Sequence, residues 1–335
     1  MFIDRRIVSV AFCICFGAAA LAEDIPWTQL SLSTSKVDEH RRANPTLDGR
    51  GIVIAVLDTG VEMDVPGLMQ TTTGEMKVID VQDFSTQGDI EIARALWNDA
   101  GDRIVHYAAE GKPELFIPPE GAAAPEEKSS GSTVWFGRIE EKVFQNSSVP
   151  DINDNKNRKD EFAICVVSRD DGSDDDAICY VDTNLNRDFS DDKPLKNYKL
   201  AYDRFTFARR EPEKQTEPIT CAVNIFLKKR IVSIHFDDGG HGTHVAGIAA
   251  GHKILGQDGF DGVAPGAKVI SLKLGHNSLA GGATTTGSKQ AAFEYAAKYA
   301  RENNVTVVCN LSYGVGSIQE GKSDIDEFLD KLMRE

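Results

Sequence analysis

The chain has 335 residues, of which 41% are hydrophobic and 27% are charged, and its formal net charge is −15. This length and composition are ordinary for a globular protein of one large domain or two modest ones. Because nucleic acids and anionic membranes attract basic surfaces, the acidic balance argues against either as a partner.

The first residues have the pattern of an export signal. Two arginines precede an apolar run over residues 7–21, and the triplet Ala-Leu-Ala ends at Ala22. This order predicts a signal peptide over residues 1–22, and a protein that is secreted or periplasmic after cleavage near Ala22. The alternative is a membrane anchor, but about 15 apolar residues are fewer than the roughly 20 that span a bilayer. We therefore expect no membrane association after cleavage.

The first predicted strand follows a short polar lead over residues 23–48. Residues 51–57 form a continuous apolar run rich in β-branched side chains. Such a run is typical of a strand buried on both faces of a parallel sheet. Asp58, Thr59 and Gly60 follow it directly. An aspartate at the carboxyl end of a parallel strand lies where open α/β sheets place their ligands and their chemistry.

The segment Asp58-Thr-Gly is ambiguous on its own. Two hydrophobic residues followed by Asp-Thr-Gly also describe pepsin-like and retroviral aspartic peptidases, in which two such carboxylates share a proton. No second Asp-Thr-Gly or Asp-Ser-Gly occurs in this chain. A third interpretation is that Asp58 only caps the turn after the strand. All three stay open at this point.

Residues 62–235 differ in composition from the segments around them. They are rich in Asp, Asn, Lys and turn residues, and they lack long amphipathic helical patterns. We therefore predict a mostly β insertion with acidic loops. Its strand-like pieces lie at residues 133–139, 162–168, 177–182 and 222–226.

Two strings in the insertion place oxygen-bearing side chains at alternate positions. One runs over residues 151–157, and the other consists of Asp182, Asn184, Asn186 and Asp188. The spacing resembles the first half of a calcium loop, although the glycine at position six and the glutamate at position twelve are absent. Calcium is therefore a hypothesis with these four residues as weak candidates, and solvated acidic turns are the interpretation that we favour.

Four cysteines remain after the predicted signal peptide. Cys165 and Cys179 each follow Ala-Ile on either side of an acidic turn, and export would permit a cross-strand disulfide between them. Free thiols are an equally open alternative. Cys309 ends an apolar run, which favours a buried thiol. The chain has no Cys-x-x-Cys pair, so a zinc site of that type is not supported.

An alternation of helices and strands returns after residue 239. The predicted elements are helix, strand, helix, strand and helix at residues 241–251, 267–274, 286–302, 305–311 and 324–334. Ser323 is the expected N-cap of the last helix. This order predicts an α/β fold, with a parallel sheet covered by helices on both faces. Because the chain ends inside the last predicted helix, we expect the sheet to be incomplete at its C-terminus.

His241 begins the string His-Gly-Thr-His-Val-Ala-Gly. The small residues let a helix pack closely against neighbouring backbone while the imidazole faces a cleft. His241 and His244 are not a zincin pair, which would require His-Glu-x-x-His. A buried structural histidine is a reasonable alternative for His244 and a poor one for His241.

Three motifs together resemble the subtilisin (S8) family of serine peptidases: Asp58-Thr-Gly, the His241 string, and Gly-Val-Ala-Pro-Gly-Ala at residues 262–267. The resemblance implies a polypeptide or peptide substrate and no required cofactor. It also implies that Asp58 orients the imidazole, while His241 acts as general base toward a serine and then as general acid. The separation of 183 positions between Asp58 and His241, together with the segments 83–89 and 310–314, resembles the tripeptidyl-peptidase II branch of the family.

The resemblance further implies a substrate-binding strand that carries Asn310, Ser312, Tyr313 and Gly314, where Tyr313 replaces the usual leucine. A core strand that ends in a turn is the structural alternative. By the same resemblance, a partial peptidase domain covers residues 49–61 and 236–335, with the insertion between them.

The chain departs from the family in lacking a nucleophile. It has no Gly-Thr-Ser followed by a small-residue helix, and the strand with the oxyanion asparagine is missing as well. We therefore expect a triad of which this chain holds Asp58 and His241 only, and we expect the chain to be inactive alone. The alternative function is a non-catalytic secreted protein that binds a ligand or calcium through its insertion, on a residual peptidase scaffold.

Overall fold

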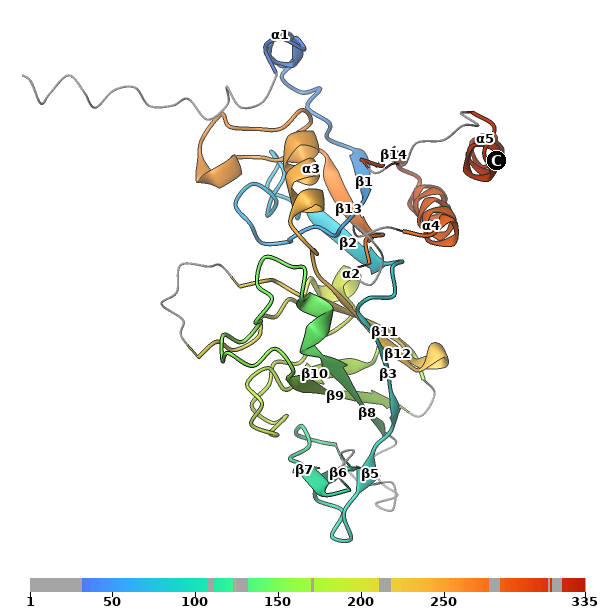
Figure 1. Cartoon of the computed structure of the whole chain (residues 1–335). Helices are drawn as coiled ribbons and strands as arrows, with labels where there is room; N and C mark the ends of the chain where they lie inside the picture. The colour runs from blue at the N-terminus through green and yellow to red at the C-terminus, as the bar shows by residue number, and fades with distance from the viewer. Residues whose placement is uncertain are drawn as a thin grey trace, which may run out of the picture.

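The computed structural model describes residues 32–107, 111–122, 124, 132–169, 172–210, 218–276, 284–312, 314 and 321–334. The predicted signal peptide and Tyr313 lie outside the described residues. Figure 1 shows an elongated molecule, with a parallel sheet and its helices at one end and antiparallel sheets at the other. None of the described helices is long and apolar enough to cross a membrane.

The parallel sheet has the strand order β14-β1-β13-β2. Its strands are β1 (Ile52–Asp58), β2 (Val78–Asp83), β13 (Lys268–Lys273) and β14 (Thr306–Asn310). β1 pairs with β13 on one side and β14 on the other, both in parallel register. Every residue of β1 after Ile52 is buried, as expected for an apolar run covered on both faces.

Helices cover the two faces of this sheet (Figure 1). Of the described helices of the whole chain, α3 and α4 pack against opposite faces. The α-helices are α1 (Val37–Ala43), α2 (Tyr198–Ala201), α3 (His241–Ala250), α4 (Thr286–Asn303) and α5 (Asp324–Leu332), and the short 3-10 helices are η2 (Glu141–Phe144), η3 (Leu227–Lys229) and η4 (Ile254–Gly256). Ile54 and Val56 of β1 pack in the core that contains α3. Val53, Ala55 and Leu57 pack in the core that contains α4. The predicted α/β class is therefore confirmed.

The last helix begins where the sequence predicts. The Ser323 side chain accepts a hydrogen bond from the Asp326 backbone N–H, and the Asp326 carboxylate accepts one from the Ser323 backbone N–H. This reciprocal capping satisfies two backbone groups that a helix start leaves without partners.

The insertion is antiparallel. Its sheets have the orders β10-β9-β8-β4, β11-β12-β3 and β5-β6-β7. The strands are β3 (Asp89–Glu91), β4 (Ala93–Arg94), β5 (Leu96–Trp97), β6 (Ile104–Tyr107), β7 (Pro113–Phe116), β8 (Ser132–Glu140), β9 (Glu161–Arg169), β10 (Ile178–Val181), β11 (Ala222–Phe226) and β12 (Ile231–His235). These sheets match the predicted β character of the segment.

One strand inside the range 62–235 belongs to the parallel sheet instead. β2 pairs in parallel with β13, so the chain leaves the parallel sheet after Asp83 and not at residue 62. Asp80 and Gln82 interrupt the apolar run of β2, and Asp80 is nonetheless buried. Because these polar residues break the apolar pattern, continuous hydrophobicity does not predict this strand.

The structure decides between the two alternatives left open for Cys165 and Cys179. Cys165 lies opposite Tyr180, and Cys179 lies opposite Val166, so the two are offset by one residue across β9 and β10. Because successive side chains of a strand point to opposite faces, the two thiols lie in different cores and cannot be bridged. Both are free. Cys309, predicted to be buried, is exposed.

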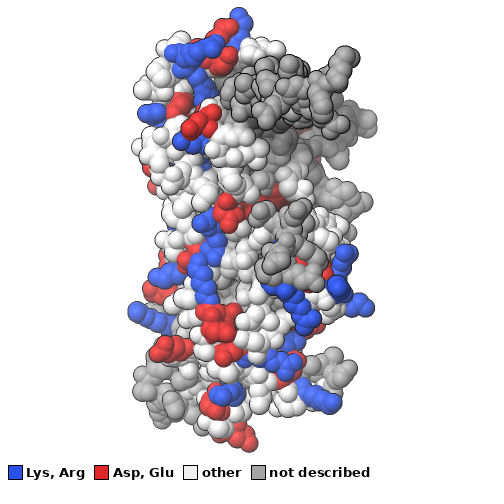
Figure 2. Space-filling view, turned by 90° about the vertical axis from the view of Figure 1, so that its left-hand side faces the viewer, with Lys and Arg blue, Asp and Glu red and all other residues white. Residues whose placement is uncertain are grey.

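Charged side chains of both signs are interspersed on the molecular surface. Figure 2 shows Lys and Arg among Asp and Glu over the whole length of one face. The net charge of −15 is therefore not gathered into one acidic surface on this side.

Candidate active site

Asp58 and His241 meet at the carboxyl edge of the parallel sheet. Asp58 is the last residue of β1, and His241 is the first residue of α3. His241 Nδ1 lies 2.6 Å from Asp58 Oδ1. The Asp58 side chain is fully buried, whereas the His241 side chain is 54% exposed. One edge of the imidazole is therefore held by a buried carboxylate while the rest of the ring reaches solvent.

Glycines allow the two segments to come this close. A Cβ atom at Gly242 would lie 2.0 Å from the Gly60 carbonyl oxygen, and one at Gly60 would lie 2.3 Å from the Phe236 carbonyl oxygen. Gly60 also has a φ of 123°, a backbone conformation that residues with a side chain rarely adopt. The loop after β1 thus requires Gly242 where it meets α3, and requires Gly60 where it meets the segment that leads into α3.

A third acid, Asp237, ties the two motifs together. Its carboxylate accepts hydrogen bonds from Thr59 Oγ1 at 2.6 Å and from the Thr243 backbone N–H at 3.1 Å. Thr59 Oγ1 in turn accepts a hydrogen bond from the Gly242 N–H at 2.9 Å. Burial raises the pKa of Asp237, and its hydrogen bonds to Thr243 and Thr59 oppose that shift. Asp237 therefore fixes the position of α3 relative to the loop after Asp58.

A buried lysine lies beneath these acids. Lys273, the last residue of β13, donates from Nζ to the Thr59 carbonyl oxygen at 2.8 Å, and Nζ lies 4.9 Å from the centre of the Phe236 ring. Burial lowers the pKa of Lys273, while the neighbouring carboxylates, Asp83 first, oppose that shift. A cation at this point offsets part of the negative charge that Asp58 and Asp237 bring into the protein interior.

One oxygen of the buried Asp58 carboxylate has no partner in the described part of the chain. Asp58 Oδ1 also accepts a hydrogen bond from the Thr59 backbone N–H at 2.8 Å. No described residue donates to Oδ2. The Asp58 backbone carbonyl accepts from the Leu274 N–H at 2.7 Å, which joins the end of β1 to the end of β13. The carboxylate is thus held firmly through one oxygen and the backbone.

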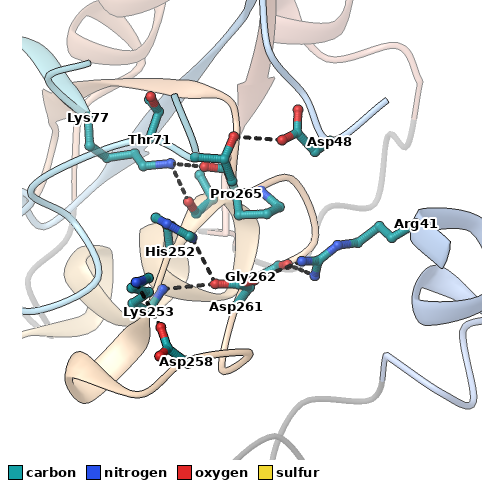
Figure 3. A network of polar contacts seen from close by, with 12 residues as sticks. Arg41, Asp48, Thr71, Lys77, His252, Lys253, Asp258, Asp261, Gly262 and Pro265 are labelled. Atoms are coloured by element: carbon teal, nitrogen blue, oxygen red, sulfur yellow. Dashed lines mark hydrogen bonds and ion pairs between the residues drawn. The ribbon is translucent and has the colours of Figure 1, made fainter. Parts of the chain in front are cut away.

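The far end of α3 is anchored by a separate network (Figure 3). Lys77 is fully buried and donates from Nζ to the carbonyl oxygens of Ala250, Pro265 and Ala267, at 2.7, 2.5 and 2.9 Å. Burial lowers its pKa to about 8. A cation near the C-terminal carbonyls of a helix is favourable because it opposes the negative end of the helix dipole.

The same network reaches the N-terminal helix. Figure 3 shows Arg41 of α1, a helix within the predicted polar lead, pointing toward Asp261 and Gly262. Its guanidinium donates to Asp261 Oδ2 at 2.8 Å and to the Gly262 carbonyl oxygen at 3.1 Å. Asp261 also accepts from the Lys253 N–H at 2.8 Å. The segment after α3 is therefore fixed to both the sheet and α1.

The described residues of the predicted substrate-binding segment lie at the end of β14, the strand next to β1, and just beyond it. Asn310 ends β14 and is opposite Val56 of β1. Asn310 Nδ2 donates to Ser312 Oγ at 3.0 Å. Ser312 and Gly314 are exposed beyond the end of the strand. The structure thus places Asn310 and Ser312 at the same edge of the sheet as Asp58, and no hydrogen bond joins either to His241 among the described residues.

The calcium candidates lie elsewhere. Asp182 directly follows β10 in the insertion, and Asn184, Asn186 and Asp188 continue the same loop. In the part of the chain that the structure describes, no three His, Cys, Asp or Glu side chains converge to hold a metal ion by themselves.

The sequence analysis missed three residues that build the site. Thr59 was noted only as part of a motif, whereas Asp237 and Lys273 were not singled out. A charged residue between Leu272 and Leu274 in an otherwise apolar strand was the available signal for Lys273. Asp237 gave a weaker signal, namely an acid four residues before a histidine that begins a helix.

Comparisons with known proteins point to a single family. The sequence profile described as the subtilase family matches residues 49–335. Tripeptidyl-peptidase 2 of Arabidopsis thaliana is 27% identical, over 81% of this chain and 22% of its own length. Pyrolysin of Pyrococcus furiosus is 25% identical, over 68% of this chain and 18% of its own.

The fold comparison agrees. The crystal structure of tripeptidyl peptidase 2 superimposes with a TM-score of 0.62 at 18% identity, covering 88% of this chain and 26% of that one. The chain therefore spans between about a fifth and a quarter of the length of the proteins it resembles.

Proposed function

We propose, because this chain belongs to the subtilase family of serine peptidases, that Asp58 and His241 are the aspartate and histidine of its catalytic triad. The observation that carries the proposal is the 2.6 Å contact between Asp58 Oδ1 and His241 Nδ1, which joins residues 183 positions apart. The close backbone contacts at Gly60 and Gly242 support the same pairing, because side chains at these positions would push the two segments apart.

The contact with Asp58 determines which nitrogen of His241 acts as the base. A carboxylate that accepts a hydrogen bond from Nδ1–H leaves Nε2 unprotonated. Nε2 would then take the proton of a serine hydroxyl as the serine oxygen attacks the peptide carbonyl carbon. The buried Asp58 carboxylate stabilises the resulting imidazolium, which gives the proton to the leaving amine.

We propose that the chain does not hydrolyse peptide bonds by itself. The 335 residues contain no Gly-Thr-Ser, and among the described residues no serine hydroxyl forms a hydrogen bond with His241. Losing the serine of a triad costs about 10⁶ in kcat in subtilisin, a known case. Activity would therefore need a serine from polypeptide other than these residues.

Two measurements on the purified chain test this proposal. We expect no cleavage of a fluorogenic peptide above the rate in buffer. We also expect a strongly deshielded proton NMR signal from His241 Nδ1–H, because that proton lies in a short hydrogen bond to a carboxylate. Asp58→Asn should abolish the signal.

His244→Ala is the matched control, since His244 is an exposed histidine of the same helix. It should leave the deshielded signal unchanged, whereas His241→Ala should remove it. Peptide cleavage that His241→Ala abolishes would overturn the proposed inactivity. A wild-type chain that folds and shows no deshielded signal would overturn the assignment of the pair.

We propose peptides or polypeptides as substrates, bound along Asn310, Ser312, Tyr313 and Gly314. The names of the related peptidases support the substrate class, and the pairing of β14 with β1 supports the location. We also propose that residues 1–22 direct export, as their charged and apolar pattern indicates. N-terminal sequencing of exported protein should then begin at Glu23, and a mature chain that retains Met1 would contradict the leader.

A further inference from the structure

Two loops of the insertion share one backbone conformation. We name residues 151–160 the first loop and residues 182–191 the second loop. In each, the carboxylate of the leading aspartate accepts hydrogen bonds from the backbone N–H groups four and five residues later. The distances are 3.0 and 2.8 Å at Asp151, and 3.0 and 3.0 Å at Asp182. The leading aspartate thus closes a tight turn in both loops.

The sixth position of each loop has the backbone turn of a calcium loop, although neither loop has the usual glycine there. Calcium loops of the EF-hand type carry glycine there, because the backbone turns sharply. Lys156 and Arg187 occupy that position and adopt φ values of 70° and 65°. The turn that glycine makes easy is therefore present without glycine.

Side chains of the first loop converge on one carboxylate. The side-chain amides of Asn153, Asn155 and Asn157 all donate to Asp160, with a distance of 2.9 Å from Asn153. The second loop has one such contact, from Asn186 to Asp191 at 2.8 Å, and five of its ten residues are exposed, against four of ten in the first loop. The first loop is therefore the more enclosed of the two.

The side-chain amide of Asn153 is buried, and only its nitrogen has a hydrogen-bond partner among the described residues. Asn153 is 5% exposed, and no donor among the described residues reaches its Oδ1. Its Nδ2 lies at the Asp160 carboxylate, so the amide end of this side chain is at the centre of the loop. A buried oxygen without a donor is unfavourable, and a cation is one partner that satisfies it. Turning this amide over would place the unsatisfied Oδ1 beside the Asp160 carboxylate, so both oxygens could share one cation.

The loop also carries negative charge that no described basic side chain neutralises. Glu141 is fully buried beneath the loop and accepts hydrogen bonds from the Ile152 N–H at 2.7 Å and the Asp160 N–H at 3.3 Å. Asp151 and Asp160 complete a group of three acids at this place. Within the described residues, no Lys or Arg forms an ion pair with these three acids. Arg209 instead pairs with Asp154.

We propose that the first loop is a calcium site, in which oxygens of Asp151, Asn153, Asn155 and Asp160 bind the ion. The donors are carboxylate and amide oxygens without His or Cys, which is the set that calcium prefers and that transition metals do not. Magnesium is the poorer candidate, because it demands strict octahedral geometry and keeps several waters. A half-turn of an asparagine amide exchanges its nitrogen for its oxygen, so the same side chains can serve the ion. The proposal does not depend on the peptidase function.

Calorimetric titration of the full chain, first treated with chelator, tests this site. We expect CaCl₂ to bind with a Kd of about 10⁻⁵–10⁻³ M, within the range of sensor and extracellular sites. MgCl₂ should bind at least about tenfold more weakly. Asp160→Asn, which removes a charge and keeps the shape, should weaken calcium binding at the first loop at least about tenfold. Calcium should also raise the melting temperature of the wild-type chain, which requires no variant to fold.

Asp175→Asn is the control, because Asp175 is an exposed acid in the turn between β9 and β10, at the opposite end of β9 from the first loop. It should change the calcium affinity less than about twofold, as expected for a distant surface charge. Should Asp160→Asn fail to fold, Asn155→Ala replaces it. Absence of binding and of a melting shift at millimolar calcium would overturn the proposal. Equal binding of magnesium would also overturn it. So would loss of calcium binding in Asp182→Asn, a variant of the second loop, with no loss in Asp160→Asn.

Discussion

Asp58 and Asp182 both lie buried at the end of a strand, but their hydrogen-bond partners come from different parts of the chain. Asp58 ends β1 and Asp182 directly follows β10, and each is 1% exposed. Asp58 binds His241, which is 183 residues away in sequence. Asp182 accepts its hydrogen bonds from the backbone four and five residues later, in its own loop. One buried acid depends on the tertiary fold, and the other is satisfied by its own turn.

The difference shows what each region needs in order to keep its acid buried. The parallel-sheet region must hold two distant backbone segments in contact, so it tolerates no added bulk between them. The loops of the insertion close on themselves, so they tolerate bulk better and depend on charge. Substitutions that add volume should therefore be severe at β1 and α3, and the predictions below run from that effect to the smallest.

Gly242→Ala should have the largest effect. The new methyl group would lie 2.0 Å from the Gly60 carbonyl oxygen and 3.1 Å from Asp58 Cβ. Because both neighbours belong to backbone or to a buried side chain, α3 must move away from β1. We expect the free energy of unfolding to fall by about 3 kcal/mol or more, as in severe overpacking. Urea denaturation followed by circular dichroism measures this loss.

Gly247→Ala is the matched control in the same helix. A Cβ atom at Gly247 meets nothing within 4 Å, and alanine favours a helix over glycine by roughly 0.5–1 kcal/mol. This variant should therefore be as stable as the wild type or more so. Equal stability of the two alanine variants would contradict the proposed tight contact between β1 and α3.

Glu62, four residues after Asp58 in the sequence, is a third kind of acid, because it forms no ion pair with a described basic residue and closes no turn of its own. Its carboxylate accepts from the Thr220 N–H at 3.2 Å. Burial raises its pKa to about 8 from 4.5. A raised folded pKa means that the stabilising contribution is complete below pH about 4.5 and is lost as the pH rises through about 8.

We therefore expect the chain to lose stability from pH 5 to pH 8, with Glu62 contributing on the order of 2–4 kcal/mol. Glu62→Gln should flatten this part of the profile, because glutamine carries no charge at either pH. Urea midpoints of the two proteins at pH 5, 6.5 and 8 give the comparison. Since other acids titrate alike in both, parallel profiles would show that Glu62 is not the titrating group.

The residues that local pattern determines were predictable from the sequence. The apolar run at residues 51–57 is β1 within one residue, because burial on both faces leaves a continuous hydrophobic signal. Ser323 caps α5 as expected, because capping involves neighbours in the chain. The proximity of Asp58 and His241 followed from family resemblance, and no local rule would have paired them.

The residues that tertiary contact determines were not predictable. β2 belongs to the parallel sheet, although Asp80 and Gln82 interrupt its apolar pattern. Asp80 is tolerated because Tyr295 of α4 donates a hydrogen bond to it, from 215 residues away. Lys273 and Asp237 are buried charges whose partners come from separate strands and loops. Only the assembled fold shows that such charges have partners.

The smallest effect should come from reducing agent. Cys165 and Cys179 lie on neighbouring strands, but the one-residue offset turns their side chains to opposite faces. A disulfide in a small secreted domain is worth about 2–5 kcal/mol, so its reduction would lower the melting temperature by several degrees. We expect dithiothreitol to change the melting temperature by less than about 1 °C, since no such bond exists to reduce. The measurement belongs on a Cys309→Ser background, because that thiol is exposed and can link two chains. A marked drop on this background would mean that β9 and β10 pair in another register, which would also shift the start of the second loop at Asp182 by one residue.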